Sequence, residues 1–255
     1  MSIVHQRIVL AIFILLSVFL PSTAKAQLFL EDGKVVLAVD GGDHINKSVT
    51  LSNTSPDEVR VKVYWEDFQY QPPFEGSKKF FPAGVGPASA NGWVSYSPQE
   101  ITLPGFGKQK IDYSISVPSK IDHGYYGVLF FEKAGQSVRD VSGLDIVVRV
   151  GCLFFIEPKN AIRKASVDKI EIKDSSIVGS FTNSGSITLI PRMVYYITDE
   201  RGLVSDPGEL KKIYVPAAAT ASWELPIPAK LDAGHYSIVI NIDLGEEQVL
   251  TEELN

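Results

Sequence analysis

The sequence has few residues of the kinds that build disulfides, metal sites and catalytic centres. It contains one cysteine, Cys152, and four histidines in 255 residues. One cysteine cannot form an intramolecular disulfide, so we expect a buried apolar thiol, with a reactive or dimer-forming thiol as the alternative. The histidines lack the converging spacing that zinc requires, and the sequence has no nucleophile elbow, phosphate loop or Cys-His couple. We therefore predict a binding protein with no metal site and no cofactor, rather than an enzyme.

Long apolar runs are also scarce, and the longest lies at the start of the chain. Residues 8–20 are almost all apolar, follow Arg7 and precede the small residues Ala24 and Ala26. A membrane-spanning helix needs about 20 apolar residues, so this shorter run predicts a signal peptide over residues 1–26, cleaved before Gln27. We expect an exported protein without a transmembrane anchor in the mature chain. It would be periplasmic in a Gram-negative organism, and otherwise secreted or in the cell envelope.

Basic residues are too few for a nucleic-acid-binding protein. Without Arg7 and Lys25, which leave with the signal peptide, 22 of the 24 basic side chains remain against 30 acidic ones. The mature chain then has a formal charge of −8, which disfavours contact with a phosphate backbone because such contact depends on clustered Lys and Arg. We expect the partner to be another exported protein, and the sequence leaves the oligomeric state open.

Alternation of polar and apolar residues replaces helical periodicity from residue 34 onward. In residues 59–65, for example, Val59, Val61, Val63 and Trp65 share one face of a predicted strand. The pattern predicts an all-β fold, and the mature chain is long enough for two domains of about 110 residues each. We predict two tandem immunoglobulin-like β-sandwiches, over residues 27–158 and 159–255, joined by a long strand and a short linker.

A ten-residue segment that occurs twice supports two sandwiches. Residues 117–126 (VPSKIDHGYY) return as residues 227–236 (IPAKLDAGHY). The shared Asp-x-Gly-x-Tyr resembles the tyrosine corner of immunoglobulin-like domains, in which the phenol hydrogen-bonds back to the backbone between two sheets. It predicts structural corner residues in both domains: Asp122, Gly124, Tyr126, Asp232, Gly234 and Tyr236.

One long alternating segment, residues 144–157, stands at the end of the first predicted domain. Its apolar positions at period two are Leu144, Ile146, Val148, Val150, Cys152, Phe154 and Ile156. A single strand of this length would extend about 45 Å. Two interpretations remain open at this point: the apolar side chains fill the core of this protein, or they are offered to a partner.

The order of these segments resembles the periplasmic pilus-chaperone (PapD-like) family. The resemblance covers roughly residues 34–158 and rests on residues 48–53 (SVTLSN), 61–65 (VKVYW), 97–105 (SPQEITLPG) and 154–158 (FFIEP). It implies two sandwiches that lend a strand to an incomplete pilus subunit by β-strand addition. The partner-binding residues would be Leu144, Ile146, Val148 and Val150. The WxL-interacting surface proteins are similar at the same positions but normally carry a membrane anchor.

The resemblance also implies a site for the terminal carboxylate of the subunit, and here the sequence departs from the family. The family uses an Arg on the first strand and a Lys on the last strand of its first domain. In this chain the corresponding strand has no Arg, and Gly151 or Leu153 stands where the Lys is expected. Lys34 and Arg149 are the nearby cations. They are either a displaced carboxylate clamp or solvated surface charges.

The first domain contains about 20 residues that the second lacks, within residues 68–93. This insertion is rich in aromatic residues, among them Phe74, Phe80, Phe81 and Trp93. Such an insertion is often functional, and its aromatic residues are then candidate contacts with a partner or glycan. The alternative is a folded hairpin whose aromatic side chains pack over the sandwich edge.

Together these features favour an exported binding protein that acts as a pilus or fimbrial assembly chaperone through residues 144–156. The alternative function is an envelope or surface adhesin-like module that binds a polymer or glycan through the aromatic insertion. Under the first hypothesis, changing residues 144–156 should abolish partner binding. Under the second, deleting the aromatic insertion should abolish it.

Overall fold

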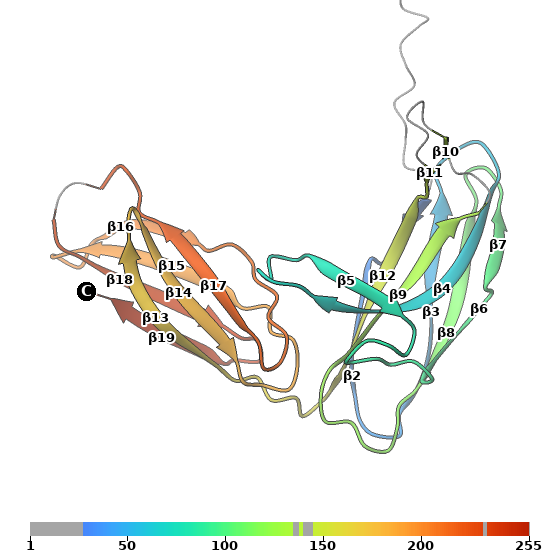
Figure 1. The fold of residues 1–255 in the computed structure, drawn as a ribbon, viewed down its shortest axis with the longest axis horizontal. Coiled ribbons are helices and arrows are strands. Elements are labelled where there is room, and N and C mark those ends of the chain that lie inside the picture. The colour runs from blue at the N-terminus through green and yellow to red at the C-terminus, as the bar shows by residue number, and fades with distance from the viewer. Residues whose placement is uncertain (1–27, 135–137, 140–144, 232–233, 255) are drawn as a thin grey trace, which may run out of the picture.

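The computed structural model describes residues 28–134, 138–139, 145–231 and 234–254. These residues form nineteen β-strands, and no helix occurs among them. The strands build two β-sandwiches, one from residues 28–158 and one from residues 165–254 (Figure 1). The predicted all-β fold with two sandwiches is confirmed. The predicted signal peptide lies outside the described residues.

The first sandwich consists of two sheets. One has the order β1 (Leu28–Leu30), β3 (His44–Asn53), β8 (Lys108–Ser116) and β6 (Val94–Ser97). The other has the order β2 (Lys34–Val39), β12 (Arg149–Pro158), β9 (Tyr125–Lys133), β4 (Val59–Tyr70) and β5 (Lys78–Pro82). A further strand, β7 (Glu100–Leu103), also pairs with β4.

Alternate residues of β4 fill the space between these two sheets. Val59, Val61, Val63 and Trp65 are all buried, as the period-two pattern predicts. The ring of Trp65 lies 5.2 Å from that of Phe154 on β12. The ring of Tyr113, on β8 of the opposite sheet, lies 5.0 Å from the same Phe154 ring, so aromatic contacts join the two sheets without a disulfide.

The second sandwich also has two sheets. One has the order β13 (Ala165–Lys173), β14 (Ser176–Asn183) and β17 (Thr220–Pro226). The other has the order β16 (Val204–Glu209), β15 (Arg192–Asp199), β18 (Tyr236–Asp243) and β19 (Val249–Leu254). Phe181, Ile197 and Trp223 are buried between the sheets. The inward positions of β15 and β17 thus correspond to those of β4 and β8, as two tandem sandwiches of the same kind predict.

The two asparagine turns occupy equivalent places at the ends of β3 and β14. Asn53 donates its side-chain amide to the carbonyl oxygens of Asp57 and Pro104, at 2.7 and 3.0 Å. Asn183 donates in the same way to Ile187 and Val215, both at 2.8 Å. Both amides are buried. Each one satisfies loop carbonyls that would otherwise lose their hydrogen bonds on burial.

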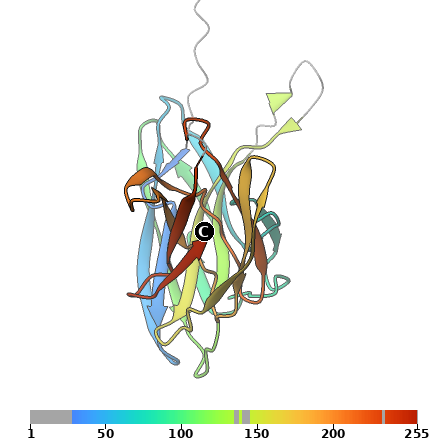
Figure 2. The same cartoon turned by 90° about the vertical axis from the view of Figure 1, so that its left-hand side faces the viewer.

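The long strand expected over residues 144–157 is interrupted, which corrects that prediction. A short strand, β11 (Asp145–Ile146), pairs with β10 (Val138–Arg139), and β12 begins only at Arg149. Figure 2 shows the short yellow-green strands β10 and β11 projecting away from the sheets. The pairing with β10 draws Ile146 out of the sheet, and Val147 and Val148 are 54% and 52% exposed. Leu144 lies outside the described residues.

Tyr126 joins the two sandwiches, and the predicted corner role is wrong for it. Its phenol oxygen accepts a hydrogen bond from the backbone N–H of Thr188 in the second sandwich, at 2.6 Å. Nearby, the N–H of Gly124 donates to the carbonyl of Ser186 at 3.0 Å. Asp122 accepts a hydrogen bond from the adjacent His123 at 2.6 Å. The first copy of the repeat is therefore an interdomain contact.

The second copy of the repeat differs from the first. Tyr236 is half-buried at the start of β18, and Gly234 is exposed. Asp232 lies outside the described residues. The corner role of Tyr236 stays a prediction.

The aromatic insertion forms a hairpin of β4 and β5 that reaches the second sandwich (Figure 1). The ring of Tyr70 stacks on that of Tyr214 at 4.7 Å. The backbone N–H of Tyr214 donates to the carbonyl of Phe74 at 2.8 Å. Phe74 is buried in a cluster that continues into the core of the second sandwich. The hairpin therefore holds the two domains together.

Candidate functional site

An open backbone edge at the start of β12 is the clearest candidate binding site. On one side β12 pairs antiparallel with β9 from Arg149 to Ile156. On the other side β2 pairs with β12 in parallel, and this ladder begins only at Leu153. The preceding strand, β1, pairs with β3 in the opposite sheet and does not extend the ladder. Within the described part of the chain, residues 149–152 thus have no strand partner on this edge.

The side chains of β12 divide between the core and the surface according to their position along the strand. Cys152, Phe154 and Ile156 are fully buried in the first sandwich, so at these positions the interpretation as its own core is correct. Val150 is half-buried at the rim of that core. Val148 stands outside the sheet and is 52% exposed. Ile146 lies on β11. The exposed apolar part of the segment is therefore its beginning.

Arg149 is held on the outer face of this sheet by aromatic and acidic neighbours. Its guanidinium lies 3.8 Å from the ring centroid of Phe130. It donates to the phenol oxygen of Tyr64 at 3.0 Å and to Glu66 at 3.1 Å. Tyr64 in turn donates to Glu132 at 2.5 Å. Burial, together with this bond to Glu132, raises the pKa of Tyr64 above its usual 10, so the phenol remains a donor at neutral pH.

The structure does not bring Lys34 and Arg149 together as a carboxylate clamp. Lys34 is level with Leu153, four residues from Arg149 along β12, which corresponds to roughly 13 Å. The ammonium of Lys34 lies 4.3 Å from the centroid of the Phe155 ring. The guanidinium of Arg149 is already paired with Glu66. The two cations therefore do not converge on one carboxylate.

The sequence pattern placed Tyr64 and Glu66 on the outer face of β4 but did not predict their contact with Arg149. Glu132 was also missed as part of this cluster. Alternation locates a side chain on a face, but the neighbour across the sheet depends on the register of β4, β9 and β12. The sequence signal for this cluster was an arginine on the outer face of one strand together with aromatic and acidic residues on the outer faces of others.

The four aromatic residues expected to form a contact surface on the insertion do not lie together. Phe74 is buried against the second sandwich. Phe80 packs against Phe130 at 5.1 Å, and Phe81 lies beneath Lys79. Trp93 packs on Tyr125 at 4.2 Å. These residues do not form a shared platform for sugar rings, and the packed-hairpin interpretation fits them better.

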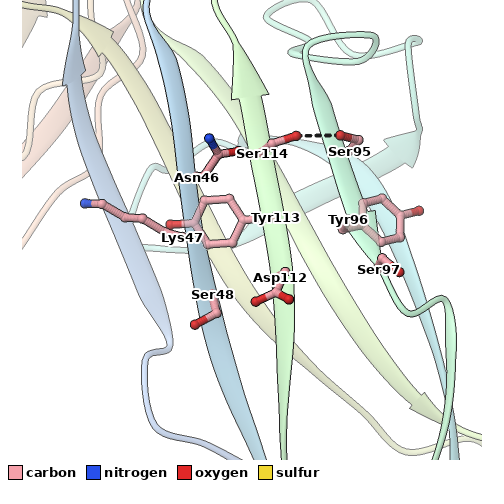
Figure 3. Close-up of a pocket in the computed structure, with 9 residues that line it drawn as sticks. All are labelled: Asn46, Lys47, Ser48, Ser95, Tyr96, Ser97, Asp112, Tyr113 and Ser114. Carbon is pink, nitrogen blue, oxygen red and sulfur yellow. Dashed lines mark hydrogen bonds between the residues drawn. The ribbon is translucent and has the colours of Figure 1, made fainter.

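A shallow polar hollow of about 460 Å³ lies on β3, β8 and β6 (Figure 3). Ser95 and Ser114 face each other across it and are hydrogen-bonded at 2.7 Å. Lys47 extends away from the other labelled side chains. None of the nine residues that line the hollow has a buried polar atom without a partner. The hollow therefore shows no group that requires a ligand.

Metal-binding groups and membrane-spanning helices are both absent from the described ranges. Those residues contain no group of three or more His, Cys, Asp or Glu arranged to hold a metal ion. No helix there is long and apolar enough to span a bilayer.

Comparison with known proteins identifies the fold. No protein-family model and no curated protein matches the sequence. Among solved structures, the class 5 fimbriae chaperone CfaA is similar with a TM-score of 0.53 and 13% identity, over 89% of this chain and 99% of that chain. A chaperone–tip adhesin complex of CFA/I fimbriae biogenesis is similar with a TM-score of 0.52 and 13% identity, over 89% and 98%. At this identity the likeness establishes the two-sandwich fold of fimbrial chaperones and no more.

Proposed function

We propose that this protein is an assembly chaperone that binds an exported subunit by β-strand addition along the start of β12. The open backbone edge of residues 149–152 carries this proposal, because the backbone groups that face away from β9 pair with no strand among the described residues and can meet an incoming one. The fold shared with fimbrial chaperones supports the same function. The subunit would be a pilus-like protein whose own sheet lacks a strand.

The side chains around the edge suit an apolar partner strand. Val147 and Val148 precede the edge and are 54% and 52% exposed. Covering these two side chains contributes about 25 cal/mol for each Å² of apolar surface removed from water. Main-chain pairing supplies affinity in this mode of recognition, and alternate side chains supply specificity. We expect Val148 to enter the subunit and Val150 to mark the limit of its contact.

Placing a charged side chain at position 148 tests the proposal. The Val148→Glu variant places a carboxylate in the expected contact, whereas Val204→Glu places one at a similarly exposed valine of β16. Each tagged protein is isolated from the exported fraction of its native cell, and the proteins that co-purify are identified by mass spectrometry. We expect the unchanged protein and Val204→Glu to retain a subunit with an incomplete immunoglobulin-like domain. Val148→Glu should retain at least tenfold less.

Two results would contradict this function. Equal recovery of the subunit by Val148→Glu and the unchanged protein would exclude strand addition at this edge. Recovery of polysaccharide in place of a protein subunit would favour the adhesin-like alternative. Circular dichroism of both variants verifies that the sandwiches remain folded.

A further inference from the structure

A small pocket lies at the contact between the two sandwiches. It has a volume of about 140 Å³. The end of β4, the loop before β6 and the turn into β9 line it from the first sandwich, and two loops of the second sandwich complete it. Tyr126, which lines the pocket, is level with Phe155 on β12, six residues beyond Arg149 and thus roughly 20 Å along the strand. The pocket is therefore separate from the open β12 edge.

The walls of the pocket include three aromatic rings. The ring of Phe68 lies 5.7 Å from that of Tyr70, nearly perpendicular to it, and 6.0 Å from that of Tyr126. All three side chains are buried. Pro87 of the first sandwich and Pro216 of the second also line the pocket. Aromatic rings favour edge-to-face and offset contacts with another ring, so this lining suits a flat aromatic occupant.

The lining of the pocket carries no fixed charge. None of the described residues that line it is Asp, Glu, Lys or Arg. His123 is the one lining residue with an imidazole, and its Nδ1 atom already pairs with Asp122 at 2.6 Å. Burial raises the pKa of Tyr126 to about 12 and also raises that of Tyr70, so both phenols are neutral at physiological pH. An ion would lose its hydration here without gaining a countercharge, so the pocket favours a neutral molecule.

Two phenol groups of the lining have a proton to donate and no acceptor for it. The Tyr126 oxygen accepts from the Thr188 N–H at 2.6 Å, but its own O–H has no acceptor among the described residues. That oxygen stands beside Gly124, where a Cβ would lie only 2.1 Å from it, and Gly124 and Thr188 both line the pocket. Tyr70 is 4% exposed, and its hydroxyl makes no hydrogen bond within the described part of the chain. Burying such donors is unfavourable, and an oxygen atom of an occupant would satisfy them.

The size of the pocket limits its occupant to about one ring. A cavity of roughly 150 Å³ with an apolar lining accommodates benzene. The pocket between the sandwiches is of similar volume, about 140 Å³. Clefts for larger ligands usually enclose roughly 300 to 1,000 Å³. The fitting ligand is therefore a single ring with a short substituent.

We propose that this pocket binds a small neutral molecule that consists of one aromatic ring and a carbonyl group. The ring packs against Phe68, and the carbonyl oxygen accepts from the O–H of Tyr126, with Tyr70 as the second donor. Because both sandwiches line the pocket, the bound molecule contacts both and stabilises the folded pair. This small-molecule site is an addition to the proposed chaperone function and does not depend on it.

A matched pair of compounds tests this inference. Acetophenone and ethylbenzene have the same ring and nearly the same size, but only acetophenone has a carbonyl oxygen. Each is titrated into the ¹⁵N-labelled protein, and binding is followed by nuclear magnetic resonance at the amide signals of Gly124 and Thr188. We expect saturable shifts at both amides, with dissociation constants on the order of 1 mM or lower.

Tyr126→Phe removes the proposed donor and keeps the ring. The dissociation constant of ethylbenzene divided by that of acetophenone should fall at least fivefold in this variant. Tyr196→Phe is the control, because Tyr196 is 37% exposed and lies outside the pocket, and it should leave the ratio unchanged. A looser contact between the sandwiches would weaken both compounds and leave the ratio informative. If Tyr126→Phe binds neither compound, the ratio is measured in Tyr70→Phe, which removes the second donor and should also lower it.

A second pair of variants tests the position of the site. Ala217→Leu adds bulk to the lining and should weaken both compounds at least fivefold, whereas Ala83→Leu, at an exposed alanine outside the pocket, should not. Three results would each overturn the inference: no saturable shift at Gly124 and Thr188, an unchanged ratio in the phenylalanine variant, or normal binding by Ala217→Leu. Val148→Glu should bind acetophenone normally, so this site and the proposed chaperone edge are tested separately.

Discussion

Replacing Tyr126 by Phe removes one hydroxyl group from the contact between the two sandwiches. Tyr126 and Thr188 are 9% and 7% exposed, and the phenol oxygen is the acceptor for the Thr188 N–H. Burial raises the pKa of Tyr126 to about 12, so the group is a neutral phenol at physiological pH. In Tyr126→Phe the Thr188 N–H stays buried but loses its acceptor. An unsatisfied buried donor costs about 1 to 3 kcal/mol.

The assay combines urea unfolding with amide hydrogen exchange. We expect the free energy of unfolding to fall by about 1 to 3 kcal/mol and the Thr188 amide to exchange faster. Exchange at Gly124 should also rise, because its N–H bonds to Ser186 in the same contact. Tyr196→Phe is the control: Tyr196 is 37% exposed, and its change should stay within about 0.5 kcal/mol.

The reasoning is refuted if Tyr126→Phe and Tyr196→Phe have the same stability and Thr188 exchanges at the unchanged rate. That outcome would mean that the interdomain hydrogen bond does not hold the sandwiches together in solution. A loss of stability without faster exchange at Thr188 would place the role of the phenol within the first sandwich, as the sequence repeat originally suggested.

Three further predictions concern buried polar groups. Burial raises the pKa of the Cys152 thiol to about 12, so a thiol reagent should label it only after unfolding, and fast labelling of the native protein would contradict this. Asp67→Asn should destabilise the protein by about 2 kcal/mol in urea unfolding. The fully buried carboxylate accepts from two backbone N–H groups at Oδ2 and from the Trp65 indole and the Ser89 hydroxyl at Oδ1, and an amide has only one oxygen with which to accept. Burial raises the pKa of Glu157, despite the opposing effect of Arg163. The folded protein thus binds the Glu157 proton more tightly, so its stability falls as pH rises from about 4.3 through the raised pKa, and Glu157→Gln should remove this slope in thermal unfolding. The other charged groups that influence Glu157 are Lys34 and Glu246.

The features that the sequence predicts correctly depend on local geometry. Val59 to Trp65 alternate because successive side chains of any strand point to opposite faces, whichever strand lies beside them. This inference requires no knowledge of the rest of the fold.

The break before β12 could not be predicted in this way. Val148 and Val150 follow the same alternation as Cys152 and Phe154, although Val148 is exposed and Cys152 is buried. The difference arises because Ile146 pairs with Val138 outside the main sheet. Which strand a segment pairs with depends on residues far away in the chain, so the alternation within one segment does not specify it.

The sequence by itself determined an all-β chain, a ten-residue segment that occurs twice and an insertion in the first domain, because side-chain periodicity and turn chemistry act over a few residues. Only the tertiary structure decided what those segments contact. It assigned Tyr126 to the second sandwich, separated Lys34 from Arg149 and docked Phe74 on the other domain. Each of these outcomes depends on register or on contact between residues far apart in the chain, so the local pattern cannot specify it.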